Sequence, residues 1–309
     1  MEIQTALRQF CDYSTFIRGF SPATISRYKS AIRLFASDVG IDTMEQVTEG
    51  AFRDFMLRGR TVRHWTANSY VTYHKSFAVF FRWCITEGYM EENPADGMEM
   101  PKTDRKLPPK LTRQEATRIL ETASNMPYPY KFLRWRNHAI FATFLYAGLR
   151  KQEVLSLMLT DMDLQNRTIF IRRGKGAKDR IVPMCGSLME SLERYLVERK
   201  RLKKTCPEFF TSLNRNVGFT DTGMKRLVEK MNAASGIKFS AHKLRHSFAT
   251  MMLEGGCDIY SLSRMMGHSD IKTTTIYLAA TAEHLRDQIG KHPMDELAGR
   301  KKPGSHNAL

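Results

Sequence analysis

The chain lacks the features that would assign it to several common classes of protein. Its five cysteines are odd in number, scattered and nowhere spaced as Cys-x-x-Cys, which argues against a disulfide framework and a zinc knuckle. The longest apolar run, Ala139 to Leu149, is about half as long as a membrane-spanning helix requires. No basic stretch followed by an apolar run stands near residue 1, so no secretory signal is expected. These absences predict a soluble protein of a reducing cytoplasm.

Positive charge is what the chain has in excess. Its 309 residues include 48 Lys and Arg against 32 Asp and Glu, a net charge of +16. Such a surface favours a polyanionic partner, and nucleic acid is the commonest of these. Ribosome-binding proteins, membrane-surface proteins and merely basic enzymes share this property, so charge by itself leaves the partner open.

Prolines mark a break in a mainly helical pattern. Residues 1–98 predict a helical domain, in which Ser21-Pro22 opens one amphipathic helix. Four prolines lie between Asn93 and Pro109, which no regular helix accommodates, so residues 99–110 predict a linker. A capping box of the form Thr-x-x-Glu at Thr112 opens a second domain over residues 111–294. Residues 295–309 predict a tail.

One pair of strands interrupts the helical pattern of the second domain. Residues 168–171 and 180–182 are rich in β-formers, and glycines lie between them, which predicts a small antiparallel hairpin. Lys175 lies near its turn, between two glycines. The spacing of a phosphate-binding Walker loop is absent, so nucleotide binding is not expected. A mobile hairpin could instead deliver the Lys175 ammonium to a DNA groove, although a flexible exposed lysine explains the same pattern.

Arg150 is predicted to lie at a turn between two helices. The preceding Gly148 lets the chain turn closely, which places Arg150 at the start of a helix. The unpaired N–H groups of a helix start favour an anion. A surface arginine paired with Glu153, three residues further on, explains the segment equally well.

Histidine, arginine and tyrosine are concentrated between residues 240 and 280. His242 and Arg245 are three residues apart on one predicted helix and therefore project from the same face. We expect both to lie outside the buried face of that helix, which should consist of Leu244, Phe248, Met251 and Met252. His268 follows Gly267 at the end of the next helix, and Tyr277 lies on a further one. Taken singly, each residue is as well explained by packing.

The order and spacing of these residues resemble the motif set of the tyrosine recombinase family (phage-integrase, Xer-like). The matching segments are Ala147-Gly148-Leu149-Arg150 with Glu153, Gly174 to Arg180, His242 to Ala249, and Leu262 to Ser269. The resemblance covers both domains. It implies a helical, SAM-like core-binding domain and a mixed α+β catalytic domain with a small antiparallel sheet, which form a C-shaped clamp on DNA. Lys151-Gln152 and Met265-Met266 depart from the usual pattern, at positions that touch no reacting group.

The resemblance implies a site-specific recombinase that cleaves and rejoins DNA through a 3′-phosphotyrosyl intermediate and a Holliday junction, in integration, excision, inversion or dimer resolution. No metal or other cofactor is implied, because the covalent link keeps the energy of the broken bond. The implied catalytic residues are Arg150, Lys175, His242, Arg245, His268 and Tyr277.

Each of these residues has an implied role. Tyr277 is the nucleophile. Arg150 and Arg245 hold the non-bridging oxygens, and His268 positions the phosphate. Lys175 protonates the departing 5′-oxygen, and His242 is a general base or proton relay.

The implied partners are double-stranded DNA with short inverted repeats and other copies of the chain. Four copies form the synaptic tetramer, in which the helix after Tyr277, with Leu285 and Ile289 on one face, docks on a neighbouring protomer. No membrane is involved, and the expected location is the cytoplasm, at the nucleoid. We expect no additional arm-binding domain before the core-binding domain, which favours a simple recombinase that recognises short inverted repeats.

Two alternatives remain. A type IB topoisomerase resembles the same catalytic set but acts as a monomer, so the two-domain layout and the helical tail favour recombination. A catalytically idle DNA-binding regulator would have no need of Tyr277. The target DNA sequence and the biological task stay open.

Overall fold

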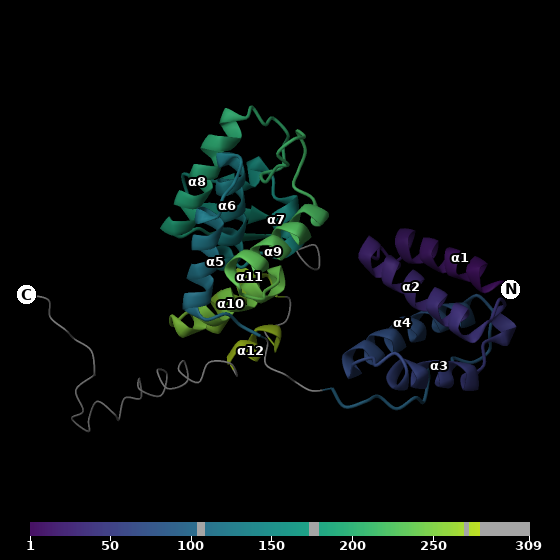
Figure 1. The fold of residues 1–309 in the computed structure, drawn as a ribbon. Coiled ribbons are helices and arrows are strands. Elements are labelled where there is room, and N and C mark those ends of the chain that lie inside the picture. The colour runs from purple at the N-terminus through teal and green to yellow at the C-terminus, as the bar shows by residue number, and fades with distance from the viewer. Residues whose placement is uncertain (104–108, 173–178, 269–271, 279–309) are drawn as a thin grey trace, which may run out of the picture. The chain divides into compact units, whose positions relative to one another are not determined.

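The computed structural model describes residues 1–103, 109–172, 179–268 and 272–278. The chain divides into two compact units, Met1–Lys106 and Leu107–Leu309 (Figure 1). The division falls within the stretch predicted as a linker, residues 99–110. Helices predominate among the described residues, which confirms the predicted mainly α class. The predicted tail, residues 295–309, lies outside the described residues.

Unit 1 consists of helices packed around aromatic side chains. Its elements are α1 (Ile3–Phe16), α2 (Pro22–Val39), η1 (Met44–Gln46), α3 (Glu49–Thr61) and α4 (Ala67–Thr86). Ser21 caps α2 as predicted, because its hydroxyl accepts from the Thr24 N–H. The rings of Phe35, Phe52 and Phe77 meet edge to face with centroids 5.0 to 5.7 Å apart. Each such pair adds about 0.5–1.5 kcal/mol beyond its buried area.

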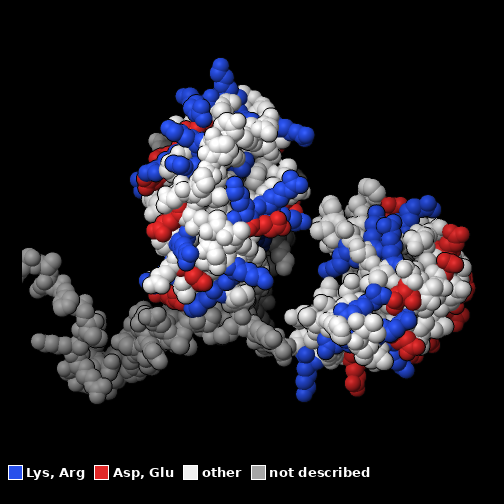
Figure 2. All heavy atoms as spheres, in the orientation of Figure 1, with Lys and Arg blue, Asp and Glu red and all other residues white. Residues whose placement is uncertain are grey.

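The basic residues of unit 1 do not form a surface of one sign on the face in view. Lys and Arg are spread over that face with Asp and Glu among them (Figure 2). Some of the arginines are paired within the unit: Arg58 and Arg63 both contact the Asp38 carboxylate, and Arg60 donates to the Trp65 carbonyl. The distribution of charge on this face therefore does not single out a set of residues as a surface for a polyanion.

Unit 2 combines helices with a small sheet. Its helices are α5 (Arg113–Asn125), α6 (Lys131–Ala147), α7 (Lys151–Ser156), η2 (Leu159–Asp161), α8 (Gly186–Arg201), α9 (Asp221–Ser235), α10 (Ala241–Glu254), α11 (Ile259–Met266) and α12 (Lys272–Leu278). The predicted strand pair is confirmed as β2 (Thr168–Ile171) and β3 (Arg180–Pro183), which are antiparallel. A further strand, β1 (Met162–Asp163), pairs with β2 and was not predicted, because two residues show no periodicity.

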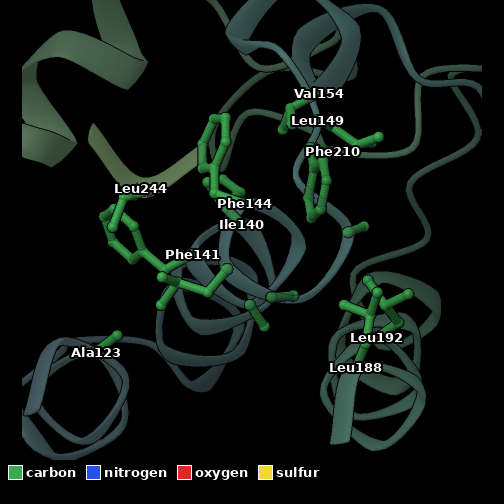
Figure 3. Packing of buried hydrophobic residues seen from close by; sticks show 14 of the residues in the cluster. Ala123, Ile140, Phe141, Phe144, Leu149, Val154, Leu188, Leu192, Phe210 and Leu244 are labelled. Carbon is green, nitrogen blue, oxygen red and sulfur yellow. The ribbon is translucent and has the colours of Figure 1, made fainter. Parts of the chain in front are cut away.

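The core of unit 2 is built around α6. Figure 3 shows side chains from several elements meeting there, among them Ile140, Phe141, Phe144, Leu188, Leu192 and Leu244. Helix α6 ends at Gly148, whose φ of 61° is left-handed. A Cβ at Gly148 would lie 2.2 Å from the Phe248 ring, so this close turn requires glycine. The turn delivers Arg150 to the start of α7, as the sequence predicted. No helix within the described ranges combines the length and apolarity that a membrane crossing demands.

Candidate active site

The carboxylate of Glu153 is the centre of an arginine cluster. Arg150 donates its backbone N–H and a guanidinium N–H to the two Glu153 oxygens, at 2.7 and 2.8 Å. Arg180 binds the same oxygens with both terminal nitrogens, at 2.8 and 2.7 Å. A nitrogen of Arg245 lies 3.9 Å from the carboxylate. Glu153 is itself buried, so one negative charge holds three guanidinium groups close together.

The ionisation of this cluster follows from its contacts. Burial alone would raise the pKa of Glu153, but the hydrogen bonds and charges of Arg180 and Arg150 outweigh burial and lower that pKa to about 2. Burial, followed by the charge of Arg150, lowers the pKa of Arg245 to about 10. At neutral pH the carboxylate is therefore ionised and Arg245 is a cation.

Backbone carbonyls fix the orientation of the arginines. Arg245 donates to the Gly148 carbonyl at 2.5 Å and to the Met266 carbonyl at 2.7 Å. Arg150 donates to the Gly267 carbonyl at 2.8 Å. These carbonyls belong to the ends of α6 and α11, where unpaired acceptors and the helix dipole favour cations. Two helix ends and one carboxylate thus pre-organise a pair of guanidinium groups.

His268 is attached to the cluster through its ring. Its Nε2 lies 3.2 Å from an Arg245 nitrogen, which can only donate, so Nε2 accepts. Its Nδ1 lies 2.7 Å from the Thr274 hydroxyl on α12. The ring therefore connects Arg245 with the helix that carries Tyr277.

Helix α10 is buried on more sides than the sequence predicted. The expectation that Arg245 lies outside the buried face is wrong, since only 4% of Arg245 is exposed. Met251 and Met252, expected in the core, are half-buried. The physical reason is that α10 packs against α6, α11 and α12, so polar positions on three sides are enclosed.

Tyr277 lies in the small apolar cluster formed by α10, α11 and α12, with 3% of its surface exposed. Its hydroxyl oxygen is 2.6 Å from Nδ1 of His246. Burial raises the pKa of Tyr277, although the charges of Arg245 and Arg150 act in the opposite direction. Burial and the charge of Arg245 lower the pKa of the half-buried His242. The phenol is thus un-ionised at neutral pH, because the effect of burial outweighs that of the two arginine charges.

The structure brings five of the six predicted residues to one region of unit 2, on or beside α7, α10, α11 and α12. They are Arg150, His242, Arg245, His268 and Tyr277. Lys175 lies outside the described residues. Within the described ranges, no three His, Cys, Asp or Glu side chains gather as metal ligands would.

Two residues of the region were not singled out from the sequence. Arg180 lies two residues before the buried Val182, so strand alternation could have pointed its side chain inward. His246 lies four residues after His242, a spacing that puts both rings on one helix face. Their ring centroids are 4.1 Å apart.

We expect Glu153→Gln to destabilise unit 2 by about 3–5 kcal/mol, because the loss of one partner leaves buried guanidinium groups uncompensated. The pKa of Glu153 is about 2 in the folded chain against 4.5 as its ordinary value. The stabilisation by the ionised Glu153 carboxylate is therefore complete above about pH 4.5 and is lost as the pH falls towards 2. Hydrogen exchange of α7 peptides, measured as a function of pH, reports this loss of stability in unit 2 alone.

The matched control is Glu190→Gln, which removes an exposed i,i+4 partner of Arg194. That loss should cost less than about 1 kcal/mol. Equal protection of α7 in the wild type and Glu153→Gln would contradict the bracing role.

Comparison with known proteins shows which family this chain matches. The model of the phage integrase family matches residues 109–284. A tyrosine recombinase XerA of Thermococcus onnurineus is 35% identical over 281 residues, which cover 89% of this chain and 92% of that protein. A tyrosine recombinase XerC of Oceanobacillus iheyensis is 30% identical over 302 residues, or 94% of this chain and 97% of that protein.

Solved structures share the fold at lower identity. The Tn1549 transposon integrase in complex with transposon right end DNA superposes with a TM-score of 0.73 and 20% identity, over 96% of this chain and 100% of that one. The XerH site-specific recombinase bound to palindromic difH substrate gives a TM-score of 0.71 and 20% identity, over 92% of this chain and 83% of that one.

Proposed function

The chain belongs to the phage integrase family and is a site-specific tyrosine recombinase, and from this premise we propose which of its residues carry the reaction. Tyr277 is the nucleophile that cuts and rejoins a DNA strand. The groups that act with it are Arg150, Lys175, His242, Arg245 and His268. Neither a type IB topoisomerase nor a catalytically idle regulator is favoured, since the curated relatives are named tyrosine recombinases.

The arginine cluster is the observation that supports this assignment most strongly. Arg150 and Arg245 are held by carbonyls and by Glu153, and a quarter of the Arg150 side chain, 25%, stays exposed. A phosphodiester that approaches this side would find planar donors already oriented toward its non-bridging oxygens. Charge that grows on those oxygens in the pentacoordinate transition state is then stabilised without reorganisation of the protein.

The proposed cleavage step forms one bond and breaks another. The Tyr277 oxygen bonds to phosphorus, the bond from phosphorus to the 5′-oxygen breaks, and the 3′-phosphate stays attached to the tyrosine. Lys175 gives a proton to the departing 5′-oxygen. His268 helps to position the phosphate, and His242 relays protons. Rejoining runs the same step backwards, with a 5′-hydroxyl as the attacking group.

The proposed substrate is double-stranded DNA with short inverted repeats, and the +16 charge supports salt-dependent binding to its backbone. We propose that the two units close on the duplex as a C-shaped clamp and that four copies assemble on two sites. Such a substrate places the protein at the nucleoid.

Strand exchange tests the proposed function. Two DNA duplexes of different length, each with the target site and one labelled, should yield labelled products of recombinant length. Relaxation of a supercoiled plasmid without recombinant products would favour the topoisomerase alternative. Binding without any covalent product would favour a regulator.

Assembly is proposed to depend on the segment after α12. Leu285 and Ile289 share one face of a predicted helix there, and unit 2 carries an apolar pocket of ≈ 280 Å³ whose lining includes Phe248 and Met252. We propose that the segment of one protomer occupies this pocket of the next.

Deletion of the residues after Ala282 should then abolish cooperative binding to paired sites, because no segment is left to dock, while binding to a single half-site persists. Gel-shift titrations on one and two sites measure both quantities. Unchanged cooperativity would contradict docking between protomers.

A further inference from the structure

We propose that His246 is the proton acceptor for Tyr277, so that its Nδ1 holds the phenolic hydroxyl and takes the proton as the oxygen attacks phosphorus. This inference rests on the proposed role of Tyr277 as the nucleophile. His246 is then a catalytic residue, because it touches the reacting hydroxyl.

The geometry of the pair is that of a donor and a base in direct contact. Nδ1 of His246 lies 2.6 Å from the Tyr277 oxygen, within the range for proton transfer. Both groups are buried, with 9% and 3% of their surfaces exposed. The ring centroids are 5.4 Å apart and the planes tilt by 54°. Two different helices, α10 and α12, hold the partners, so their contact is a product of the tertiary fold.

The protonation state of His246 suits an acceptor. Burial and the neighbouring His242 and Arg245 lower the pKa of His246 to about 4, so the ring is neutral at physiological pH. A neutral ring that accepts at Nδ1 carries its hydrogen on Nε2, and the phenol then donates. In this arrangement the lone pairs of the Tyr277 oxygen are directed away from the proton and can attack.

His242 contacts the ring of His246 and has a different role in the proposed proton transfer. The hydrogen bond to the phenol is made by His246, and the ring of His242 contacts that of His246 edge to face. This order assigns the first proton transfer to His246 and leaves His242 for relay.

The proton moves together with the nucleophilic attack. Before attack, full transfer of the proton from Tyr277 to His246 is unfavourable, because burial raises the pKa of the phenol while the pKa of the imidazole is lowered to about 4. Once the oxygen bonds to phosphorus its proton becomes strongly acidic, and transfer to Nδ1 becomes downhill. The bond between phosphorus and the 5′-oxygen breaks in the same step, and the 5′-oxygen is protonated by Lys175. In rejoining, His246 returns the proton to the departing phenolate.

Bound DNA should make His246 a better base. Among the described groups, the charges of Arg245 and Arg150 act on Tyr277, and His242 and Arg245 act on His246. Further out, Glu153 on α7, Arg180 on β3 and His268 after α11 act on or contact Arg245, and Cys257 before α11 packs against the apolar cluster of Tyr277. Cations outnumber the single carboxylate among them. A phosphate held by Arg150 and Arg245 adds negative charge, which favours the imidazolium that transfer creates.

Two variants test the proposal on a suicide substrate that traps the covalent adduct. His246→Asn keeps an oxygen that can accept the hydrogen bond, but this amide cannot take up the proton. His246→Phe removes the acceptor and keeps a ring. Both should slow single-turnover cleavage at neutral pH by about 10²–10⁴-fold. The defect should shrink as the pH rises towards the pKa of the phenol, because hydroxide then ionises Tyr277.

The control is Thr250→Val, one turn along α10. Thr250 is also buried and donates to the His246 carbonyl, so the loss of its hydroxyl disturbs the same helix without touching the phenol. The Thr250→Val variant should cleave at close to the wild-type rate, and all three variants should bind DNA as the wild type does.

If the variants do not fold, a measurement on the unaltered chain can test the proposal instead. With a 5′-bridging phosphorothiolate the sulfur leaves without a proton, so a solvent deuterium isotope effect on cleavage reports the Tyr277 proton. We expect such an effect, and its absence would overturn the proposal.

Other outcomes would also overturn it. These are wild-type rates in both His246 variants, full activity in His246→Asn, faster cleavage in either, or a defect that does not change with pH. Adducts formed by Tyr277→Phe would instead refute the nucleophile, and with it the premise.

Discussion

Tyr277→Phe should abolish covalent attachment of the chain to DNA and leave DNA affinity nearly unchanged. The phenyl ring fills the same apolar cluster but has no oxygen to bond to phosphorus. Loss of a nucleophile costs far more than loss of a supporting group, so we expect at least about a 10⁴-fold fall in adduct formation. Trapping on a suicide substrate measures the adduct, and a gel shift measures the affinity.

The substitution also removes the partner of a buried His246 nitrogen, which should lower stability by about 1–3 kcal/mol. A matched control is Tyr260→Phe on α11, because 64% of Tyr260 is exposed. That variant should form adducts at the wild-type rate. Adducts that persist in Tyr277→Phe would refute the assignment.

Arg245→Lys should slow single-turnover cleavage by about 10²–10³-fold, or roughly 3–4 kcal/mol of barrier. Lysine keeps the positive charge but has no planar fork. It cannot reach the Gly148 and Met266 carbonyls and the His268 ring together, as Arg245 does. The phosphate would therefore lose a donor that is held in place before it arrives. Rapid-quench measurement at saturating protein separates this loss from weaker binding.

Arg194→Lys provides the comparison for this result. Arg194 is half exposed, pairs with Glu190 and covers the Trp135 ring, so its replacement should leave the cleavage rate unchanged. Cleavage by Arg245→Lys at the wild-type rate would remove Arg245 from the proposed transition state.

Local signals in the sequence predicted local structure well. The helix start at Arg150 follows from Gly148, because a left-handed residue ends one helix before the next begins. The capping box at Thr112 and the strand pair around residue 175 depend on neighbours a few positions apart, and both are present at the expected places. The gathering of Arg150 and Arg245 agrees with the resemblance to the recombinases, although their catalytic roles stay predictions.

Contacts between distant residues could not be predicted in the same way. Arg180 and Glu153 are 27 residues apart, and His246 and Tyr277 are 31 apart. No periodicity links such pairs. The apolar pattern of α10 also failed to show that Arg245 is buried, because a pattern on one helix does not tell how many other helices surround it. A buried guanidinium is tolerated there only because carbonyls from two helix ends accept its hydrogens.

The most direct test of the central claim is to map the DNA attachment site. Wild-type chain is trapped on a suicide substrate, digested, and the peptide that carries the nucleotide is identified by mass spectrometry. We predict a 3′-phosphate esterified to the oxygen of Tyr277. Attachment at any other residue, or a cleaved strand with no peptide bound, would contradict the account.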